Sequence, residues 1–244
     1  MKNEILLNQD TSRWNKAQEY EKNWWAERKD IVDFNFYKEF AGDMLNFISN
    51  HFEIKPETKI LEIGSGAGGI ITYLKQSENR YAIDPLEGFY SSVEEFSHQR
   101  DNNVKYFTAA GEAIPINDNY FDLVIMDNVL DHCIDPSKVM KEVSRVLKPK
   151  GFLYFKQNTY HLWGIFVRFL MEKMVIDKGH PHTFSKSDLK KFAFENNLTE
   201  LKKTRSGYIN TWVKEIKGAG LKNKLKAFLF VTRDKVTILY RKDK

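Results

Sequence analysis

Residues 59–70 read Lys-Ile-Leu-Glu-Ile-Gly-Ser-Gly-Ala-Gly-Gly-Ile, and this stretch decides the fold class of the chain. The apolar residues at 60, 61 and 63 predict a short buried strand. The glycines at 64, 66, 68 and 69 predict a tight turn, because glycine tolerates positive φ and allows a ligand to approach the backbone. A helix over 69–77 is expected to follow. A strand, a glycine turn and a helix in this order predict the nucleotide pocket of an open α/β sheet.

Strands and helices alternate on both sides of this stretch. The strands are predicted at 59–63, 80–84, 104–108, 121–127, 151–157, 198–205 and 234–241. Helices are predicted at 12–28, 34–51, 69–77, 87–98, 136–147, 160–173 and 186–196, with a polar loop around 177–183 and an aromatic, basic segment at 207–230. This alternation indicates βαβ units and a parallel sheet. No internal repeat or Pro/Gly/Ser linker divides the chain, so we expect a single domain over 1–244.

Composition narrows the class of protein. The chain has 244 residues, 38 basic against 33 acidic side chains and a formal charge of +5. Its single cysteine, Cys133, excludes an intramolecular disulfide and a cysteine-based zinc site. Residues 1–10 lack the apolar core of a secretory signal, and no apolar run reaches 18 residues, so we expect a cytoplasmic protein without a membrane span. The basic excess lies late in the chain. A partner there would be nucleic acid or an anionic membrane, but a solvated lysine-rich face is the simpler expectation.

The identity of the nucleotide rests on more than the glycines. Gly64, Gly66 and Gly69 also satisfy the G-x-G-x-x-G pattern of dinucleotide-binding proteins. Asp84 ends the second strand, twenty residues after Gly64, where a carboxylate suits the ribose of either nucleotide. Three later segments add information: Ala-Gly-Glu-Ala-Ile-Pro-Ile at 110–116, Asn-Asp-Asn-Tyr-Phe-Asp-Leu-Val-Ile-Met-Asp at 117–127, and Val-Leu-Lys-Pro-Lys-Gly at 146–151.

Together these segments resemble the successive motifs of the class I S-adenosylmethionine-dependent methyltransferases, in the small-molecule group similar to methyltransferase type 11. The resemblance covers residues 58–157. It implies a Rossmann-like, doubly wound, mostly parallel seven-stranded sheet with an antiparallel last strand. Around a cofactor-binding core at 56–158, we expect acceptor-side helices and strands at 159–244 and, from the aromatic residues at 14–25, an N-terminal helical lid at 1–55. Packing of these aromatic residues against the sheet edge is the alternative. The cofactor would be S-adenosylmethionine, with S-adenosylhomocysteine as product.

The resemblance also assigns cofactor contacts. The turn at 64–68 would lie along the methionine part, Asp84 would bind the ribose, Glu112 and Ala113 the adenine, and Asp127 and Asn128 would lie beside the sulfonium. The full set of expected cofactor residues is Glu62, Gly64, Ser65, Gly66, Gly68, Asp84, Pro85, Gly111, Glu112, Ala113, Asp127 and Asn128. Lys150 departs from the family, which more often has glycine at this turn.

Elementary chemistry agrees with this cofactor. An adenosine without phosphate needs no Lys or Arg in the glycine turn, and none is present. A cationic sulfonium favours nearby carboxylates, and Glu62 and Asp127 are available. Two structural alternatives stay open, because Glu62 would also serve as a helix-capping carboxylate and Asp84 as a strand-end turn residue.

Three histidines are candidate catalytic bases. His132 follows the fourth strand, where the acceptor must approach, although relatives often pack a histidine there under the next loop. His180 and His182 flank Pro181 ahead of a helix whose start is predicted at Ser185. Proline favours an extended conformation at the residue before it, so His180 and His182 should point in different directions. Their spacing does not match a helical metal motif, and no metal is expected.

The acceptor pocket is expected from aromatic and charged residues outside the core. The candidates are Tyr20, Trp24, Trp25, Asp131, Tyr160, Arg168, Arg205 and Tyr208. The arginines favour an anionic acceptor. We therefore expect methyl transfer to oxygen of a small polar acceptor that is phosphorylated or linked to a sugar or nucleotide, in surface-polysaccharide precursors or specialised metabolites. The alternatives are a methyltransferase acting on nucleic acid or protein and, less favoured, an NAD-dependent oxidoreductase.

Overall fold

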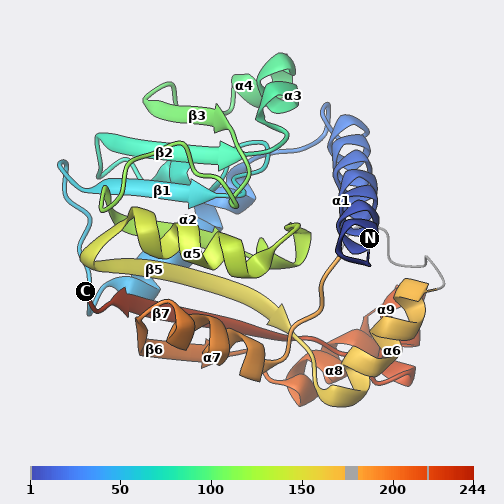
Figure 1. Ribbon diagram of the computed structural model, residues 1–244. Helices are drawn as coiled ribbons and strands as arrows, with labels where there is room; N and C mark the ends of the chain where they lie inside the picture. Colours follow the sequence, from blue (N-terminus) through green and yellow to red (C-terminus); the bar gives the residue numbers. More distant parts are fainter. Residues whose placement is uncertain (1, 174–180, 219) are drawn as a thin grey trace.

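A single seven-stranded sheet organises the chain in the computed structural model, which describes residues 2–173, 181–218 and 220–244. The strand order is β3-β2-β1-β4-β5-β7-β6 (Figure 1). The strands are β1 (Lys59–Ile63), β2 (Asn79–Asp84), β3 (Val104–Thr108), β4 (Phe121–Asp127), β5 (Leu147–Thr159), β6 (Leu198–Arg205) and β7 (Asp234–Lys242). Only β7 runs antiparallel to its two neighbours, β5 and β6. The predicted fold class, including the antiparallel last strand, is confirmed.

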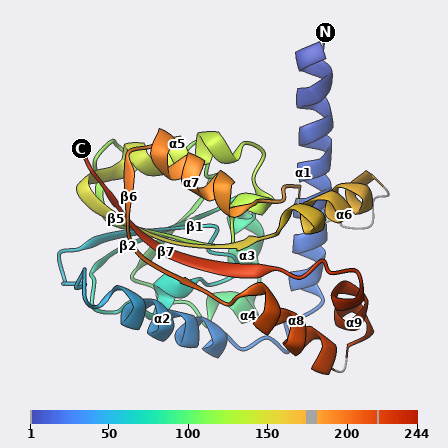
Figure 2. The same ribbon diagram turned by 90° about the horizontal axis from the view of Figure 1, so that it is seen from below.

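The two faces of the sheet are covered by different helices, because successive side chains of a strand point to opposite faces. Leu61 and Ile63 belong to the core beneath α5 (Pro136–Val146) and α7 (Lys186–Glu195). Ile60 belongs to the core beneath α2 (Asn35–Ile48) and the short 3-10 helix η1 (Ile70–Tyr73). Figure 2 shows α5 and α7 on one side of the sheet and α2 on the other.

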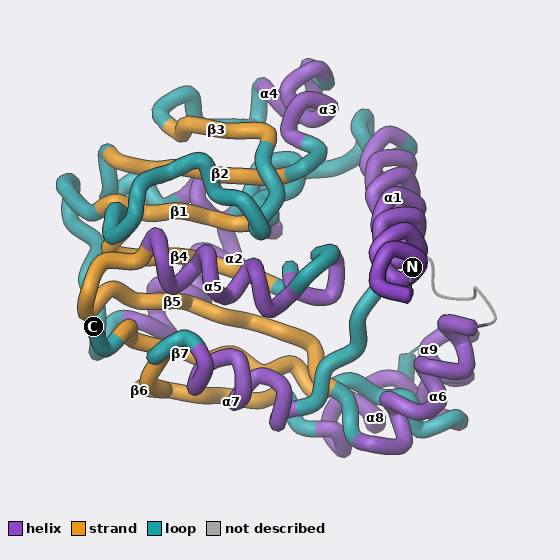
Figure 3. The backbone as a smooth tube through the Cα atoms, in the orientation of Figure 1, coloured by secondary structure: helices purple, strands orange, loops and turns teal. Residues whose placement is uncertain are grey.

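The remaining long helices lie beyond the edge where the parallel strands end (Figures 1 and 3). They are α1 (Lys2–Ala26), α6 (Leu162–Lys173), α8 (Tyr208–Lys217) and α9 (Leu221–Phe228). The short helices α3 (Glu87–Ser92), α4 (Glu94–Ser97) and η2 (Leu130–His132) complete the chain. Among the described residues, no helix is both long enough and apolar enough to cross a bilayer.

Two predicted helices are shorter than expected. The helix predicted at 69–77 is only the four-residue η1, which begins with β-branched Ile70, Ile71 and Thr72. Such side chains are poor helix formers, and the Thr72 hydroxyl donates to the Gly68 carbonyl at 2.7 Å. The helix predicted at 87–98 is divided into α3 and α4 by Val93, whose backbone is extended. Most of the predicted loop at 177–183 lies outside the described residues.

Candidate active site

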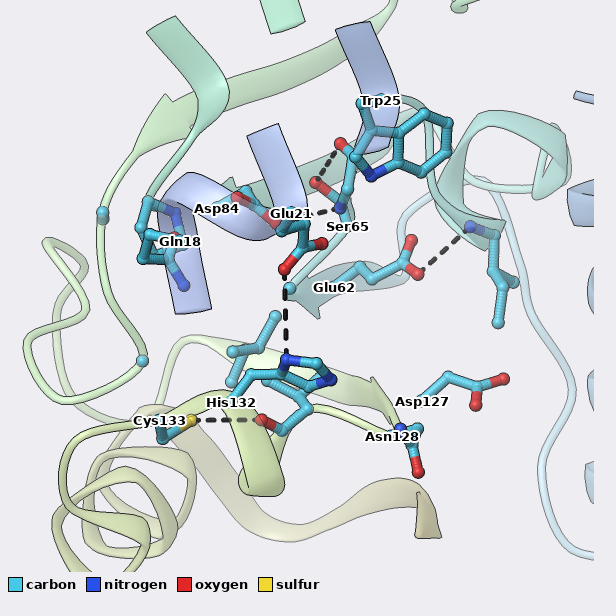
Figure 4. A pocket seen from close by; sticks show the side chains of 18 of the residues that line it. Gln18, Glu21, Trp25, Glu62, Ser65, Asp84, Asp127, Asn128, His132 and Cys133 are labelled. Atoms are coloured by element: carbon cyan, nitrogen blue, oxygen red, sulfur yellow. Dashed lines mark hydrogen bonds and ion pairs between the residues drawn. The ribbon is translucent and has the colours of Figure 1, made fainter. Parts of the chain in front are cut away.

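A cavity of about 320 Å³ lies at the carboxyl ends of β1, β2 and β4, with α1 as one wall (Figure 4). Its volume is in the range of pockets for small molecules and cofactors. The lining residues are Trp14, Gln18, Glu21, Trp25, Tyr37, Phe40, Glu62, Ile63, Gly64, Ser65, Gly66, Ile70, Asp84, Pro85, Ala109, Gly111, Glu112, Asp127, Asn128, Val129, His132 and Cys133. Most of the predicted cofactor residues therefore meet in one place.

The glycine turn is shaped by positive φ and by close packing. Gly66 has φ of +57°, and a Cβ there would lie 2.9 Å from the Tyr37 hydroxyl oxygen. Gly68 has an ordinary φ, but a Cβ there would lie 2.5 Å from the ring of Phe34, and Gly68 does not line the cavity. The turn therefore needs glycine for two different reasons, one conformational and one steric.

Glu62 is a buried carboxylate that holds the turn to the strand. Its Oε1 accepts from the backbone N–H of Ile70 at 3.1 Å, and its Oε2 accepts from that of Ile71 at 2.8 Å. These are the first backbone donors of η1, so Glu62 caps that helix while its side chain lines the cavity. Burial raises the pKa of Glu62 to about 8, although the two hydrogen bonds act in the opposite direction.

Asp84 lies at the end of β2 and fixes the next loop. Its carboxylate accepts from the backbone N–H of Gly66 at 2.9 Å and of Leu86 at 2.8 Å. Burial raises the pKa of Asp84 to about 7, and the negative charge of Glu21 on α1 adds to the rise. The following Pro85 also lines the cavity. Asp84 thus joins the β1 turn to the β2 loop at the place where a ribose was expected.

Glu112 faces the cavity but binds the next loop. Its Oε1 accepts from the backbone N–H groups of Ile134 at 2.7 Å and Asp135 at 3.1 Å. The neighbouring Gly111 lines the cavity, whereas the exposed Ala113 does not. The structure therefore places Gly111 and Glu112 at the expected adenine side and leaves Ala113 outside.

The end of β4 supplies the last two of the predicted cofactor residues, Asp127 and Asn128. Asp127 accepts from the Lys156 ammonium at 2.8 Å. Asn128 has φ of +59°, and its side-chain oxygen accepts from the backbone N–H of Asn158 at 3.1 Å. Both residues line the cavity. The bonds to β5 hold these two side chains at the open end of the strand.

Acidic side chains outnumber basic ones on the cavity wall. Glu21, Glu62, Asp84, Glu112 and Asp127 all line it, and none of its lining residues in the described chain is Lys or Arg. A dinucleotide brings a pyrophosphate, which would meet repulsion here. S-adenosylmethionine brings an ammonium, a sulfonium and one carboxylate, which sum to a net positive charge, and it brings no phosphate, so these residues fit that cofactor.

Comparison with known families agrees with this geometry. Residues 61–155 match the family described as methyltransferase domain. This segment is a class I methyltransferase domain. The cofactor of this family is S-adenosylmethionine. The expectation drawn from the motifs is therefore confirmed for the family and its cofactor.

Individual relatives of this methyltransferase domain are distant. A glycine/sarcosine/dimethylglycine N-methyltransferase from Actinopolyspora halophila is 33% identical over 107 residues, which are 42% of this chain and 19% of that protein. A ubiquinone biosynthesis O-methyltransferase from Rickettsia bellii is 28% identical over 145 residues, which are 56% of this chain and 59% of that protein. The chain spans less than two thirds of the length of these curated relatives.

Solved structures share the fold at low identity. The YcgJ protein from Bacillus subtilis superposes with a TM-score of 0.61 at 18% identity, over 83% of this chain and 99% of that one. A geranyl diphosphate C-methyltransferase from Streptomyces coelicolor, solved with Mg²⁺, geranyl diphosphate and S-adenosylhomocysteine, also gives 0.61 at 12% identity, over 83% of this chain and 77% of that one. At these identities the likeness concerns the fold.

Of the three candidate histidines, the structure places His132 at the cavity. Its Nδ1 lies 4.0 Å from a carboxylate oxygen of Glu21, and the two side chains point toward one another (Figure 4). His182 is outside the cavity lining, because its Nε2 donates to the Cys133 carbonyl at 2.9 Å and its ring stacks on Phe184. His180 lies outside the described residues.

Of the predicted acceptor residues, only Trp25 lines the cavity. Asp131 is buried and accepts from the Gln157 amide at 2.9 Å. Arg168 is also buried, and it donates to Thr183 at 2.9 Å and to the Tyr160 hydroxyl at 3.3 Å. The other members of the predicted set lie on α1, β6 and α8, away from the cavity lining: Tyr20, Trp24, Arg205 and Tyr208.

Sequence reasoning missed the polar side chains of α1. Trp14, Gln18, Glu21 and Trp25 follow one another at intervals of four, three and four residues, so they share one face of the helix. The Oε1 atom of Gln18 is buried and has no hydrogen-bond partner within the described chain. The helical spacing of these four residues could have identified the face of α1 that lines the cavity. The prediction relied on aromatic residues instead and chose Tyr20 and Trp24, which lie outside this face.

Proposed function

We propose that the protein is an S-adenosylmethionine-dependent methyltransferase that acts on a small-molecule acceptor, at oxygen. One observation carries the proposal: five carboxylates and no Lys or Arg line the cavity at the glycine turn of a class I methyltransferase domain. The relatives include an N-methyltransferase and an O-methyltransferase, so the family leaves the acceptor atom open.

Different residues of the cavity would bind different parts of the cofactor. The glycine turn, held by Glu62, would receive the methionine part, and Asp84 would accept hydrogen bonds from ribose hydroxyls. The bound cofactor supplies a methyl group on a cationic sulfonium. Trp25 and the rest of the α1 wall would exclude water. Holding acceptor and cofactor in line supplies much of the acceleration in such a transfer.

Calorimetric titration tests the cofactor assignment. We expect S-adenosylhomocysteine to bind and NADH not to bind. Asp84→Asn should weaken S-adenosylhomocysteine binding at least about tenfold, because a charge-assisted hydrogen bond is lost. Asp30→Asn, the same change at an exposed position, is the matched control and should bind normally. Tight NADH binding without a response to S-adenosylhomocysteine would overturn the proposal.

For the acceptor, we propose that His132 removes the hydroxyl proton, since it is the candidate histidine that lines the cavity. Glu21, 4.0 Å away, would orient its ring and stabilise its protonated form. We retain the polar acceptor, linked to a sugar or nucleotide or belonging to specialised metabolism, and the cytoplasmic location as predictions. The preference for a phosphorylated acceptor loses its support from Arg168, which is buried outside the cavity lining and whose Nε and Nη1 donate to Thr183 and Tyr160.

A screen for methyl transfer tests this role. Hydroxylated, amino and thiol small molecules are offered with methyl-labelled S-adenosylmethionine. We expect a hydroxylated acceptor to take up the label, which gives a labelled methyl ether, S-adenosylhomocysteine and a released proton. His132→Gln should then lower kcat by about a hundredfold or more while leaving S-adenosylhomocysteine affinity unchanged. His98→Gln, at an exposed histidine on the surface, should keep the full rate. Equal rates for His132→Gln and the unmodified protein would contradict the assignment.

A further inference from the structure

Helix α6 is oriented with apolar side chains outward. Leu162 is 85% exposed, and Trp163 and Phe166 are each about half exposed. Their spacing, continued by the exposed Phe169, places them on one helix face. Arg168, a charged residue of the same helix, is buried instead. This is the reverse of the usual arrangement for a helix at a protein surface, and exposed apolar patches of this kind mark interaction sites.

The end of α9 extends this surface. Phe228 is 79% exposed, and Leu229 and Phe230 are also exposed. The indole N–H of Trp163 donates to the Leu229 carbonyl at 3.0 Å, so α6 and the end of α9 lie side by side. We call the joined surface the apolar patch and define it by Leu162, Trp163, Phe166, Phe228, Leu229 and Phe230.

Basic side chains are concentrated in the segment that contains α8 and α9. Residues 205–235, which contain α8 and α9, carry eight Lys or Arg against two Asp or Glu. Their net charge of +6 exceeds the +5 of the whole chain. Lys214, Lys217 and Lys224 are exposed on these helices. Two copies of such a surface would repel one another, so the charge argues against a second copy of this chain as the occupant.

We propose that the apolar patch docks on an anionic phospholipid bilayer, with α6 and the end of α9 in the headgroup region. Exposed Leu, Trp and Phe beside clustered lysines is the chemistry of helices that lie in a membrane interface. Anionic headgroups would attract the lysines, and the apolar side chains would leave water. Nucleic acid would satisfy the lysines but would leave aliphatic Leu162 and Leu229 without an apolar partner. The late basic segment, which we expected to be a solvated face, is therefore assigned to contact with an anionic bilayer.

The position of the apolar patch determines which side of the molecule would face the bilayer. Helices α6 and α9 lie beyond the same edge of the sheet as α1 and the cavity (Figures 1 and 2). A docked bilayer would therefore lie on the side of the molecule where the parallel strands end, and not against α5 or α2.

Vesicle flotation tests the proposal on the full chain. Neutral phosphatidylcholine vesicles are compared with vesicles containing about one third phosphatidylglycerol, at low and high salt. We expect binding to the anionic vesicles that falls at least about tenfold at high salt. The measurement needs neither cofactor nor acceptor, so its outcome is independent of the proposed methyl transfer.

Variants locate the docking surface. Phe166→Ser and Phe228→Ser should each lower vesicle binding at least about tenfold, since each removes an inserted aromatic side chain. Phe194→Ser is the matched control, because Phe194 is 86% exposed but lies on α7, outside the apolar patch. The double change Lys217→Gln with Lys224→Gln should lower binding to anionic vesicles by about tenfold or more. Unchanged melting temperatures would show that these variants fold.

Three results would overturn the proposal. One is the absence of binding to anionic vesicles. Another is binding that Phe166→Ser and Phe228→Ser leave intact. The third is a different occupant: self-association in water that these variants abolish would assign the apolar patch to a second copy, and tight RNA or DNA binding without vesicle binding would assign the lysines to nucleic acid.

Discussion

At the scale of single residues, Lys150 carries an unfavourable backbone conformation. Its φ is +65°, in the left-handed region, at the turn that precedes Gly151 within β5. A side chain at such a φ costs about 1 kcal/mol or more, and glycine avoids that cost. The sequence showed that Lys150 departs from the family's glycine. The structure adds the physical reason why glycine is common there.

Replacing Lys150 by glycine should therefore stabilise the protein. We expect Lys150→Gly to raise the free energy of unfolding by about 1 kcal/mol in urea denaturation. Lys150→Ala is the control, because it removes the same exposed side chain but keeps a Cβ at positive φ. Equal stability of the two variants would mean that the backbone conformation at Lys150 is not strained.

Single residues of the motifs could be located from the sequence because strand ends and turns of a parallel sheet meet at one edge. Gly66, Asp84 and Asp127 needed only their position after a buried strand. Glu62 allowed two interpretations, and the structure shows that its carboxylate caps η1. The position of His182 outside the cavity could not be predicted, because its hydrogen-bond partner Cys133 is far away in sequence and the neighbouring residues do not indicate this bond.

At the scale of elements, the sequence placed every strand but not the orientation of α1. Helical spacing predicted this helix, and its aromatic residues suggested a lid. Which of those aromatics face inward is decided by partners elsewhere: Trp25 packs edge-on against Phe34, Tyr90 and Phe96. That packing turns Gln18 and Glu21 toward the cavity. When a helix has apolar, aromatic and charged residues on several sides, its composition alone does not predict which side faces the rest of the protein.

At the scale of the whole molecule, two buried carboxylates couple stability to pH. Burial raises the pKa of Glu62 to about 8 and that of Asp84 to about 7, from ordinary values near 4. Between these limits the folded protein holds more protons than the unfolded chain. Unfolding then releases protons, so the free energy of unfolding falls as pH rises. Against the effect of burial, the backbone N–H of Asn103 and then Arg80 lower the pKa of Asp101, and Arg145 lowers that of Glu142. These two groups act in the opposite direction only below about pH 4.5.

The melting temperature of the ligand-free protein should accordingly fall between pH 5 and pH 8, most steeply between pH 5 and pH 7. Circular dichroism at a series of pH values measures this slope. Asp84→Asn should flatten it, because the amide does not titrate, whereas Asp30→Asn should leave it unchanged. A slope that Asp84→Asn does not alter would show that Asp84 has no raised pKa in the folded state.

The aromatic cluster under α1 links the attachment of this helix to the binding of a ligand in the cavity. Trp25 and Tyr37 line the cavity, and with Phe34, Tyr90 and Phe96 they form one buried cluster that fastens α1 to the domain. Detachment of α1 and departure of a ligand from the cavity therefore share a coupling free energy, which acts equally in both directions. A ligand that contacts Trp25 holds the helix down. A change that loosens Phe96, which is not among the cavity's lining residues, would lower the apparent affinity for the ligand in proportion to the fraction of molecules in which α1 is attached.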